Sequence, residues 1–255
     1  MSIQIIPKDQ QAYGQFNGGA IVENKPIGFP QDGGPTAPYS NLFYWAYAKA
    51  VEDSTIGLHP HQGFEIMSFV LNGNIRHYDT KLKEWRPLSA GDVQIIRAGN
   101  GIQHAEHMAK DAVMFQIWVD PNLNETLRKE ATYNDYKQTD FPHIEQDGVK
   151  CIQYTGDAAP MWMDAPKVHI CRLEFTASAK YDDLPKGDLT HSIYVLEGAV
   201  QIDGETAKQD DFIIVPAAEI SALEGEENTK LFVISSPQQP DYKTYATIMQ
   251  ERMRT

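Results

Sequence analysis

Two pairs of residues with metal-binding side chains stand close together in the first half of the sequence. His59 and His61 form one pair, His104 and Glu106 form the other, and one residue separates the members of each pair. In a β-strand, side chains at positions i and i+2 point to the same face. If the two strands are neighbours, the four side chains converge on one point and can hold one ion.

Three imidazoles and one carboxylate form a mixed nitrogen and oxygen ligand set. Imidazole suits Fe, Ni, Cu, Zn and Mn, and the carboxylate shifts the preference towards harder divalent ions. Four protein ligands leave one or two positions open on a five- or six-coordinate ion, as a redox or Lewis-acid site requires. Core histidines without a ligand role are the alternative. The paired pattern favours a site for one divalent transition metal, held by His59, His61, His104 and Glu106.

Short apolar runs separated by turn residues surround these pairs and indicate an all-β fold. Asn72, Gly73 and Asn74 form a typical hairpin turn between two of the runs. The runs that we expect to be strands are 64–71, 75–79, 93–96 and 113–119 in the first half, and 168–175, 192–196, 199–202, 212–215 and 231–235 in the second.

The second half repeats the pattern of the first. Residues 69–75 (FVLNGNI) correspond to 194–200 (YVLEGAV), and residues 90–96 (AGDVQII) correspond to 209–215 (QDDFIIV). An internal duplication of a β unit explains this better than chance. We therefore expect an N-terminal barrel over 1–122, a polar connection over 123–145 with a short helix near 124–132, and a C-terminal barrel over 146–255. Apolar residues at helical spacing predict a C-terminal helix within 241–253.

The composition narrows the class of protein. A formal net charge of −13 over 255 residues repels a phosphate backbone, so direct nucleic-acid binding is not expected. No apolar stretch approaches the ~20 residues that cross a bilayer, and residues 1–30 lack a basic start followed by an apolar run. We expect a cytoplasmic protein without a membrane segment. Cys151 and Cys171 are expected to be buried strand thiols, and a disulfide between them stays open.

The segments that carry the two pairs resemble a known family. Residues 57–65 (GLHPHQGFE) are similar to the first cupin motif, and residues 91–106 (GDVQIIRAGNGIQHAE) are similar to the second. Together with FQIWV at 115–119, they resemble the pirin family in particular. The resemblance implies a bicupin of two jelly-roll barrels with one iron(II) in the N-terminal barrel, bound by His59, His61, His104 and Glu106. Cupins in general often use the motif-one glutamate, here Glu65, and the pirin pattern favours Glu106.

The resemblance implies two kinds of function. Several bacterial pirin-like proteins are quercetin 2,3-dioxygenases, which open a flavonol ring with O₂ and release carbon monoxide. In that reading Glu106 is the general base for the flavonol 3-hydroxyl. The alternative is a non-enzymatic, iron-dependent redox regulator that acts through protein contacts. Another metal-dependent cupin reaction is a third reading. The ligand types leave Ni, Mn, Cu and Zn open as the metal.

Some features depart from the family pattern or remain candidates. Gln62 stands where pirins usually carry Arg, so a cation beside the site is absent. In the second half His191 has no HxH neighbour and no later HxE partner, which predicts a metal-free C-terminal barrel. With both barrels in one chain, we expect a monomer. The candidates for an apolar substrate pocket are Phe64, Met67, Phe69, Phe115 and Trp118, with plain barrel core as the alternative for each.

Overall fold

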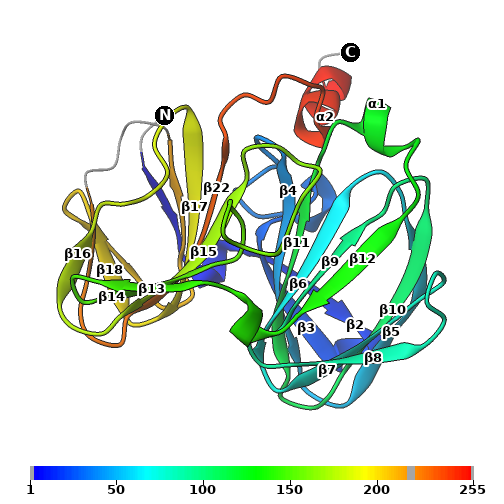
Figure 1. Cartoon of the computed structure of the whole chain (residues 1–255), viewed down its shortest axis with the longest axis horizontal. Coiled ribbons are helices and arrows are strands. Elements are labelled where there is room, and N and C mark those ends of the chain that lie inside the picture. Colours follow the sequence, from blue (N-terminus) through cyan, green and yellow to red (C-terminus); the bar gives the residue numbers. More distant parts are fainter. Residues whose placement is uncertain (1–2, 217–221, 254–255) are drawn as a thin grey trace. The chain divides into compact units, whose positions relative to one another are not determined.

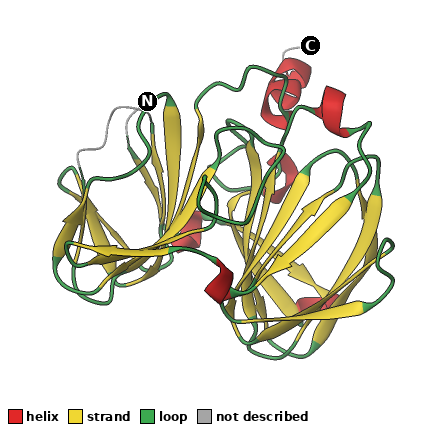
Figure 2. Ribbon diagram, in the orientation of Figure 1, coloured by secondary structure: helices red, strands yellow, loops and turns green. Residues whose placement is uncertain are grey.

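The computed structural model describes residues 3–216 and 222–253, and most of its regular structure is β (Figures 1 and 2). The chain forms two compact units. The unit that we call the first barrel comprises Gln11–Gln138, Met163–Pro166 and the chain from Asp241 on. The second barrel comprises the chain up to Gln10, Thr139–Trp162 and Lys167–Pro240. The prediction of an all-β fold with two barrels is confirmed.

The first barrel consists of a seven-stranded and a four-stranded sheet, in which the paired strands run antiparallel. The larger sheet has the order β12 (Thr132–Tyr136), β9 (Val93–Arg97), β6 (Glu65–Asn72), β11 (Val113–Val119), β4 (Leu42–Ala50), β3 (Ile21–Ile27) and β2 (Ala12–Phe16). The smaller sheet has the order β5 (Ser54–His61), β10 (Ile102–Met108), β7 (Asn74–Asp79) and β8 (Trp85–Ser89).

The second barrel has the same two-sheet construction. Its larger sheet has the order β1 (Gln4–Ile6), β20 (Phe212–Val215), β17 (Leu189–Glu197), β22 (Lys230–Pro237), β15 (His169–Phe175), β14 (Val149–Gln153) and β13 (His143–Gln146). Its smaller sheet has the order β16 (Ala179–Tyr181), β21 (Leu223–Gly225), β18 (Ala199–Ile202) and β19 (Glu205–Lys208).

The two barrels repeat one topology. The pair β6 and β7 in the first barrel corresponds to β17 and β18 in the second, which are the segments that correspond in sequence. Gly73 and Gly198 stand at the same turn, with φ of 72° and 74°. A Cβ on Gly73 would lie 2.9 Å from the backbone of Ala112, and a Cβ on Gly198 would lie 2.8 Å from Thr229 Oγ1. Glycine is therefore required at both turns.

The sheets of each barrel pack face to face over an apolar core. In the first barrel Ala48, Val70 and Met114 of the larger sheet meet Ile75 and Met108 of the smaller one. In the second barrel, side chains from both sheets form one larger cluster that includes Leu173, Ile193, Val200, Leu223 and Val233. Cys151 and Cys171 belong to this region and are free thiols. Alternation along the strands turns every second side chain inward, which is how the sequence pattern specifies both cores.

The bounds of the two compact units differ from the expected boundaries at 122 and 145. The reason is that segments outside the expected ranges pair with strands of one unit or the other. β12, from the expected connection, pairs with β9 of the first barrel, whereas β13 pairs with β14 of the second. β1, near the chain start, pairs with β20 of the second barrel. The connection also contains the short helix α1 (Leu123–Thr126), which Asn122 caps at its N-terminus.

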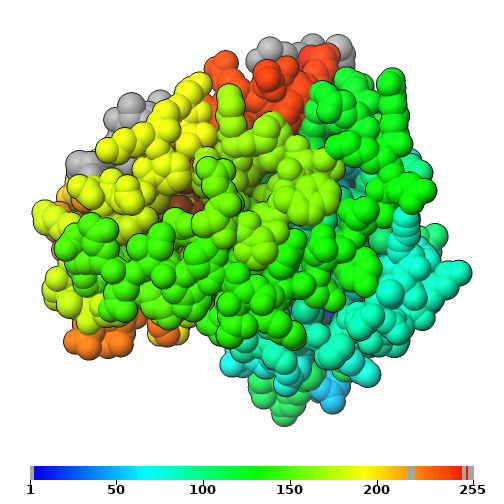
Figure 3. Space-filling model, viewed as in Figure 1, coloured from blue at the N-terminus to red at the C-terminus, as the bar shows by residue number. Residues whose placement is uncertain are grey.

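The C-terminal helix forms as α2 (Tyr245–Met253) and belongs to the first barrel rather than the second. It lies against β4, and the Tyr245 ring packs on Phe29 and Phe43 with centroids 5.7 and 5.1 Å away. Its residues are visible at the molecular surface, in red, in Figure 3. Within the two described ranges, no helix has the length and apolar character needed to cross a membrane.

Candidate metal centre

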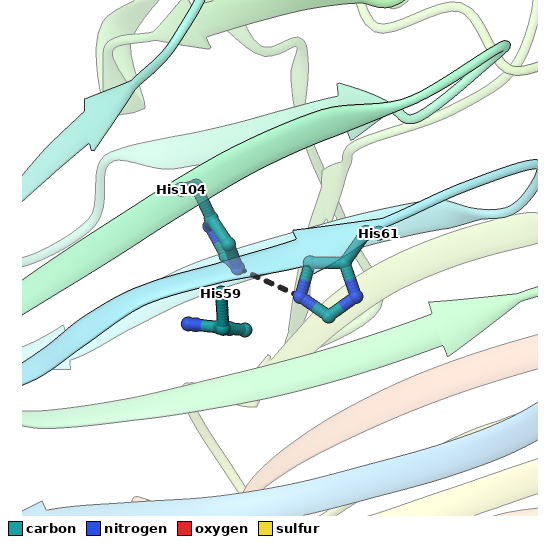
Figure 4. A group of neighbouring side chains, drawn as sticks. All are labelled: His59, His61 and His104. Atoms are coloured by element: carbon teal, nitrogen blue, oxygen red, sulfur yellow. Dashed lines mark hydrogen bonds between the residues drawn. The ribbon is translucent and has the colours of Figure 1, made fainter.

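Three histidines from two neighbouring strands converge inside the first barrel (Figure 4). His59 and His61 are on β5, His104 is on β10, and the antiparallel register places His104 directly opposite His59. Potential ligand atoms of the three rings all lie within 4.8 Å of one another. This is the juxtaposition that the HxH and HxE spacings predict for two adjacent strands.

The rings are arranged with their nitrogens directed at one another. His61 Nε2 lies 2.9 Å from His104 Nε2, and His59 Nδ1 lies 2.8 Å from the carbonyl oxygen of Gly57. Because a carbonyl only accepts, His59 donates from Nδ1 and keeps a lone pair on Nε2. A ligating histidine commonly holds its other nitrogen against a backbone carbonyl in this way. The donor set is therefore compatible with a transition-metal site.

The surroundings of His61 and His104 favour the neutral form of these two rings. Burial, followed by the neighbouring His104 and His59, lowers the pKa of His61 to about 3. Burial also holds the pKa of His104 well below its ordinary value, with His59 and His77 acting in the same direction. Neutral imidazole is the form that binds a metal, so no proton competes for these nitrogens at neutral pH.

Glu106, the fourth expected ligand, lies in the same barrel interior but has other partners. Its carboxylate accepts hydrogen bonds from Gln116 Nε2 at 2.8 and 2.7 Å and from Ser68 Oγ at 3.3 Å. A β-bulge on the β5 side separates His104 from Glu106 in the pairing register. The structure therefore brings three of the four expected ligands together and holds the fourth, 1% exposed, against Gln116.

Glu65, the alternative ligand, has hydrogen-bond partners outside the histidine cluster for both of its carboxylate oxygens. Its two carboxylate oxygens accept from the backbone N–H groups of Asp164 and Ala165 at 2.8 and 2.9 Å, and Arg97 Nε lies 3.8 Å away. Burial raises the pKa of Glu65 to about 7 against the opposing effect of these hydrogen bonds. Its role is to fix the segment 163–166 on the first barrel.

His77, which belongs to neither of the two residue pairs singled out in the sequence, has a specific setting in the structure. His77 and Asp79 are on β7, both turned into the barrel, with His77 Nε2 3.0 Å from Asp79 Oδ2. Burial acts to raise the pKa of Asp79, yet hydrogen bonds from His77, Leu82 and Lys81 outweigh it and leave the pKa below its ordinary value. The HxD spacing on a strand next to the HxE strand is the signal that could have identified this pair.

An open pocket of about 530 Å³ lies at the edge of the histidine cluster. His61 and Phe64 line it together with Pro60, Gln62, Thr80, Asn100, Gly101, Ile102 and Gln103. The rings of Phe64 and Trp118 lie 5.4 and 5.1 Å from that of His61. Of the aromatic and aliphatic candidates, Phe64 and Trp118 therefore flank the site.

The other pocket candidates lie on the opposite face of the sheet. Met67, Phe69 and Phe115 alternate in sequence with residues that face the site, such as Ser68 and Gln116, and they are at most 2% exposed. Strand alternation excludes them from the pocket. For these three residues the plain packing alternative is correct.

The remaining histidines lie away from the cluster. His107, on the other face of β10, contacts Thr55 Oγ1 through Nδ1 at 3.0 Å, and His143 is exposed. In the second barrel His191 Nδ1 lies 2.8 Å from Ser235 Oγ, and burial followed by the influence of His169 lowers the pKa of His191 to about 4. Among the described residues, the group of three or more potential metal ligands is the cluster in the first barrel.

The fold and the inward-facing histidines define a cupin-type protein of two barrels. The family model described as Pirin matches residues 35–119, the part of the first barrel that contains the cluster. The first half of the chain thus contains a match to the Pirin family model, and the relatives of the chain include pirins. It is 26% identical over 196 residues to a putative quercetin 2,3-dioxygenase of Zymomonas mobilis, an alignment that covers 74% of this chain and 80% of the relative.

Some relatives match over less of their length, among them human pirin. Human pirin is 30% identical over 158 residues, which are 59% of this chain and 53% of human pirin, so the aligned region spans about half of that relative. Among solved structures, the nickel complex of the Escherichia coli pirin YhhW is similar with a TM-score of 0.77 and 18% identity, over 92% of this chain and 99% of YhhW. A quercetin 2,3-dioxygenase from Acinetobacter baumannii is similar with a TM-score of 0.80 and 17% identity, over 99% of this chain and 88% of the other. These structures share the fold.

Proposed function

We propose that this protein is an iron(II)-dependent dioxygenase that opens the central ring of a flavonol-like substrate with O₂ and releases carbon monoxide. The observation that carries the proposal is the cluster of three imidazoles at the edge of an open pocket, with a buried carboxylate in the same barrel interior. Support also comes from the relatives named as putative quercetin 2,3-dioxygenases.

In the proposal, His59, His61 and His104 hold the metal through nitrogen lone pairs, and Glu106 is the fourth ligand. The donor set suits iron, as well as nickel, manganese, copper and zinc. When bound, the metal supplies a Lewis acid for the substrate's enol oxygen and a redox centre for reaction with O₂. His104 is fully buried, whereas His61 lines the open pocket and is 9% exposed, so the pocket reaches the cluster at His61.

Glu106 is also the proposed general base, which accepts the proton of the flavonol 3-hydroxyl at a carboxylate oxygen. For that role, one oxygen must leave the side-chain amide of Gln116, which now donates to both oxygens. Ser68 Oγ remains as a donor to Oε1 and stabilises the carboxylate in either position. In this proposal Gln116 must therefore release one oxygen of Glu106, whereas the hydrogen bond from Ser68 can be kept.

The pocket has features that suit a flat aromatic ligand. Phe64 and Trp118 lie with ring centroids 5.2 Å apart and 32° between their planes, beside His61. Around them, the side-chain amide of Gln62 donates to Asn100 O at 3.2 Å at the pocket rim. The lining is mixed, with Pro60, Phe64 and Ile102 as apolar side chains and with polar side chains that can fix a ligand's orientation at Gln62, Thr80, Asn100 and Gln103.

A metal-dependent regulator that acts through protein contacts is the second candidate. The observation that favours it is the engagement of Glu106 with Gln116, away from the histidine cluster, together with Gln62 in place of a cation at the rim. In this candidate the net charge of −13 suits a partner with a basic surface.

The deciding experiment is anaerobic loading with Fe(II), followed by addition of quercetin and O₂. The expected result is loss of flavonol absorbance with release of one carbon monoxide for each flavonol consumed. His107→Gln, on the outer face of β10, is the matched control that retains activity, whereas His104→Ala loses it. Stoichiometric metal binding without turnover contradicts flavonol oxygenation and favours the regulator or another metal-dependent reaction.

A further inference from the structure

His77 and Asp79 lie next to the histidine cluster, and the proposed chemistry uses neither of them. In the register between β7 and β10, Asp79 is directly opposite His104 and His77 is directly opposite Glu106. The ring centroids of His77 and His104 are 5.5 Å apart. Each of these side chains is at most 1% exposed, so every polar atom in the group needs a partner inside the barrel.

The hydrogen bonds of Asp79 determine which nitrogen of His77 carries the proton. Asp79 Oδ1 accepts from the backbone N–H groups of Lys81 and Leu82, both at 2.7 Å, while Oδ2 faces His77 Nε2 at 3.0 Å. A carboxylate only accepts, so His77 donates from Nε2. A neutral imidazole with its proton on Nε2 presents a lone pair on Nδ1.

His104 has the complementary requirement. A metal at His104 Nε2 requires the proton of the neutral ring to be on Nδ1, which makes that atom an obligate donor. His104 Nδ1 and His77 Nδ1 are both buried, and neither has a hydrogen-bond partner among the described residues. Leaving a buried donor or acceptor unsatisfied costs about 1–3 kcal/mol. This donor and this acceptor belong to neighbouring rings, whose centroids are 5.5 Å apart.

We propose that His77 is a positioning residue of the metal centre, which accepts the Nδ1–H of His104, while Asp79 fixes the tautomer of His77 that can do so. The inference rests on the proposed metal site. The resulting chain runs from the metal through His104 and His77 to Asp79 and ends on the backbone at Lys81 and Leu82. Such outer partners orient a ligating imidazole and raise its basicity, and their loss weakens metal binding by about 10- to 100-fold.

The test measures the affinity of the metal-free protein for Zn(II) by competition with a chelator. His77→Phe fills the space without a polar atom, and we expect binding about 10- to 100-fold weaker. His77→Gln should recover most of the loss, because its amide oxygen can accept from His104 while its amide N–H donates to Asp79. A residue that serves only packing would show the opposite order, with Phe the better substitute.

Asp79→Asn tests the tautomer separately. The introduced asparagine keeps Oδ1 for the two backbone N–H groups, but its amide N–H now points at His77 Nε2 and moves the proton of His77 to Nδ1. Two donors then face each other at His104, so we expect weaker Zn(II) binding although His77 is intact. The same exchange at a catalytic aspartate–histidine pair disables a serine protease through the wrong tautomer.

Controls separate this inference from the metal site itself. His107→Gln, on the outer face of β10, should bind Zn(II) like the wild type, and urea unfolding of each metal-free variant reports any structural loss. If the wild type binds no equivalent of Zn(II), the metal centre and this inference both fail. If the wild type binds Zn(II), and the folded His77→Phe and Asp79→Asn variants bind it equally well, only the role of His77 is overturned.

Discussion

The side-chain amide of Gln116 donates to both carboxylate oxygens of Glu106, at 2.8 and 2.7 Å, inside the first barrel. The two residues are on strands of different sheets, β11 and β10, so this contact joins the two layers of the barrel at the level of the site. It also decides whether Glu106 is free to turn towards the histidines. The behaviour of Glu106 and Gln116 therefore reports on the proposed chemistry.

Glu106→Gln removes the negative charge and the capacity to accept a substrate proton while preserving size. We expect Fe(II) binding to be retained at least in part, since three imidazoles remain, and flavonol turnover to be lost. Metal content after gel filtration and carbon monoxide release measure the two effects on one sample. Unimpaired turnover by this variant would exclude Glu106 as the base.

Gln116→Leu removes the amide that holds Glu106 and leaves the carboxylate with the hydroxyl of Ser68. The metal-free variant should be less stable by about 1–3 kcal/mol, because a buried carboxylate loses hydrogen bonds to a neutral donor. We expect Zn(II) to restore much of this loss, since the released carboxylate can then bind the metal. Urea unfolding with and without Zn(II) measures both values.

Gln201→Leu, at an exposed position of the second barrel, is the control for the Gln116 experiment. It should change stability by no more than about 0.5 kcal/mol with or without the metal. An equal loss of stability in metal-free and metal-bound Gln116→Leu would mean that Glu106 does not approach the metal.

His104→Ala should abolish stoichiometric metal binding and leave the β fold largely intact. His104 is fully buried and its ring lies against those of His59 and His61, so its removal takes away the ligand that β10 supplies to the cluster. Far-ultraviolet circular dichroism checks the fold and inductively coupled plasma mass spectrometry checks the metal. Retention of one full equivalent would show that His104 is not a ligand.

The sequence predicted the elements with the strongest local signals. Strand 113–119 and strand 199–202 have the expected bounds, because alternating apolar residues end at clear turn residues. The convergence of His59, His61 and His104 followed from i, i+2 spacing on adjacent strands. These features depend only on a strand and the strand next to it. Local patterns in the sequence can predict structure on that scale.

Other features depend on contacts that no local pattern records. Thr132–Tyr136 has a mostly exposed, polar composition and reads as a connection, yet it pairs with β9. Tyr245 joins α2 to the first barrel through an aromatic cluster formed by distant residues. The hydrogen bonds from Gln116 to Glu106 likewise form only when the two sheets pack together. The partner of this carboxylate could therefore not be predicted from the sequence.

Asp120 makes the free energy of unfolding of the first barrel depend on pH, with a contribution that decreases as pH rises. Burial raises the pKa of Asp120 to about 7, against a hydrogen bond from the backbone N–H of Tyr245 to Oδ2 at 2.5 Å. A carboxyl whose pKa is higher in the folded state binds more protons there than in the unfolded chain. Its contribution to the free energy of unfolding is therefore present at low pH and is lost as pH rises from about 4 to about 7.

Asp120→Asn should remove this contribution to the pH dependence. The amide oxygen of asparagine can still accept from the Tyr245 N–H, while the cost of ionising a buried carboxyl disappears. We expect the variant to be more stable than the wild type above pH 7 by about 1–4 kcal/mol, with the difference shrinking towards pH 4. Urea unfolding at several pH values measures this, with Asp157→Asn at an exposed site as the control. A constant difference between variant and wild type from about pH 4 to about pH 8 would contradict the assignment, because a group with equal pKa in both states contributes no slope.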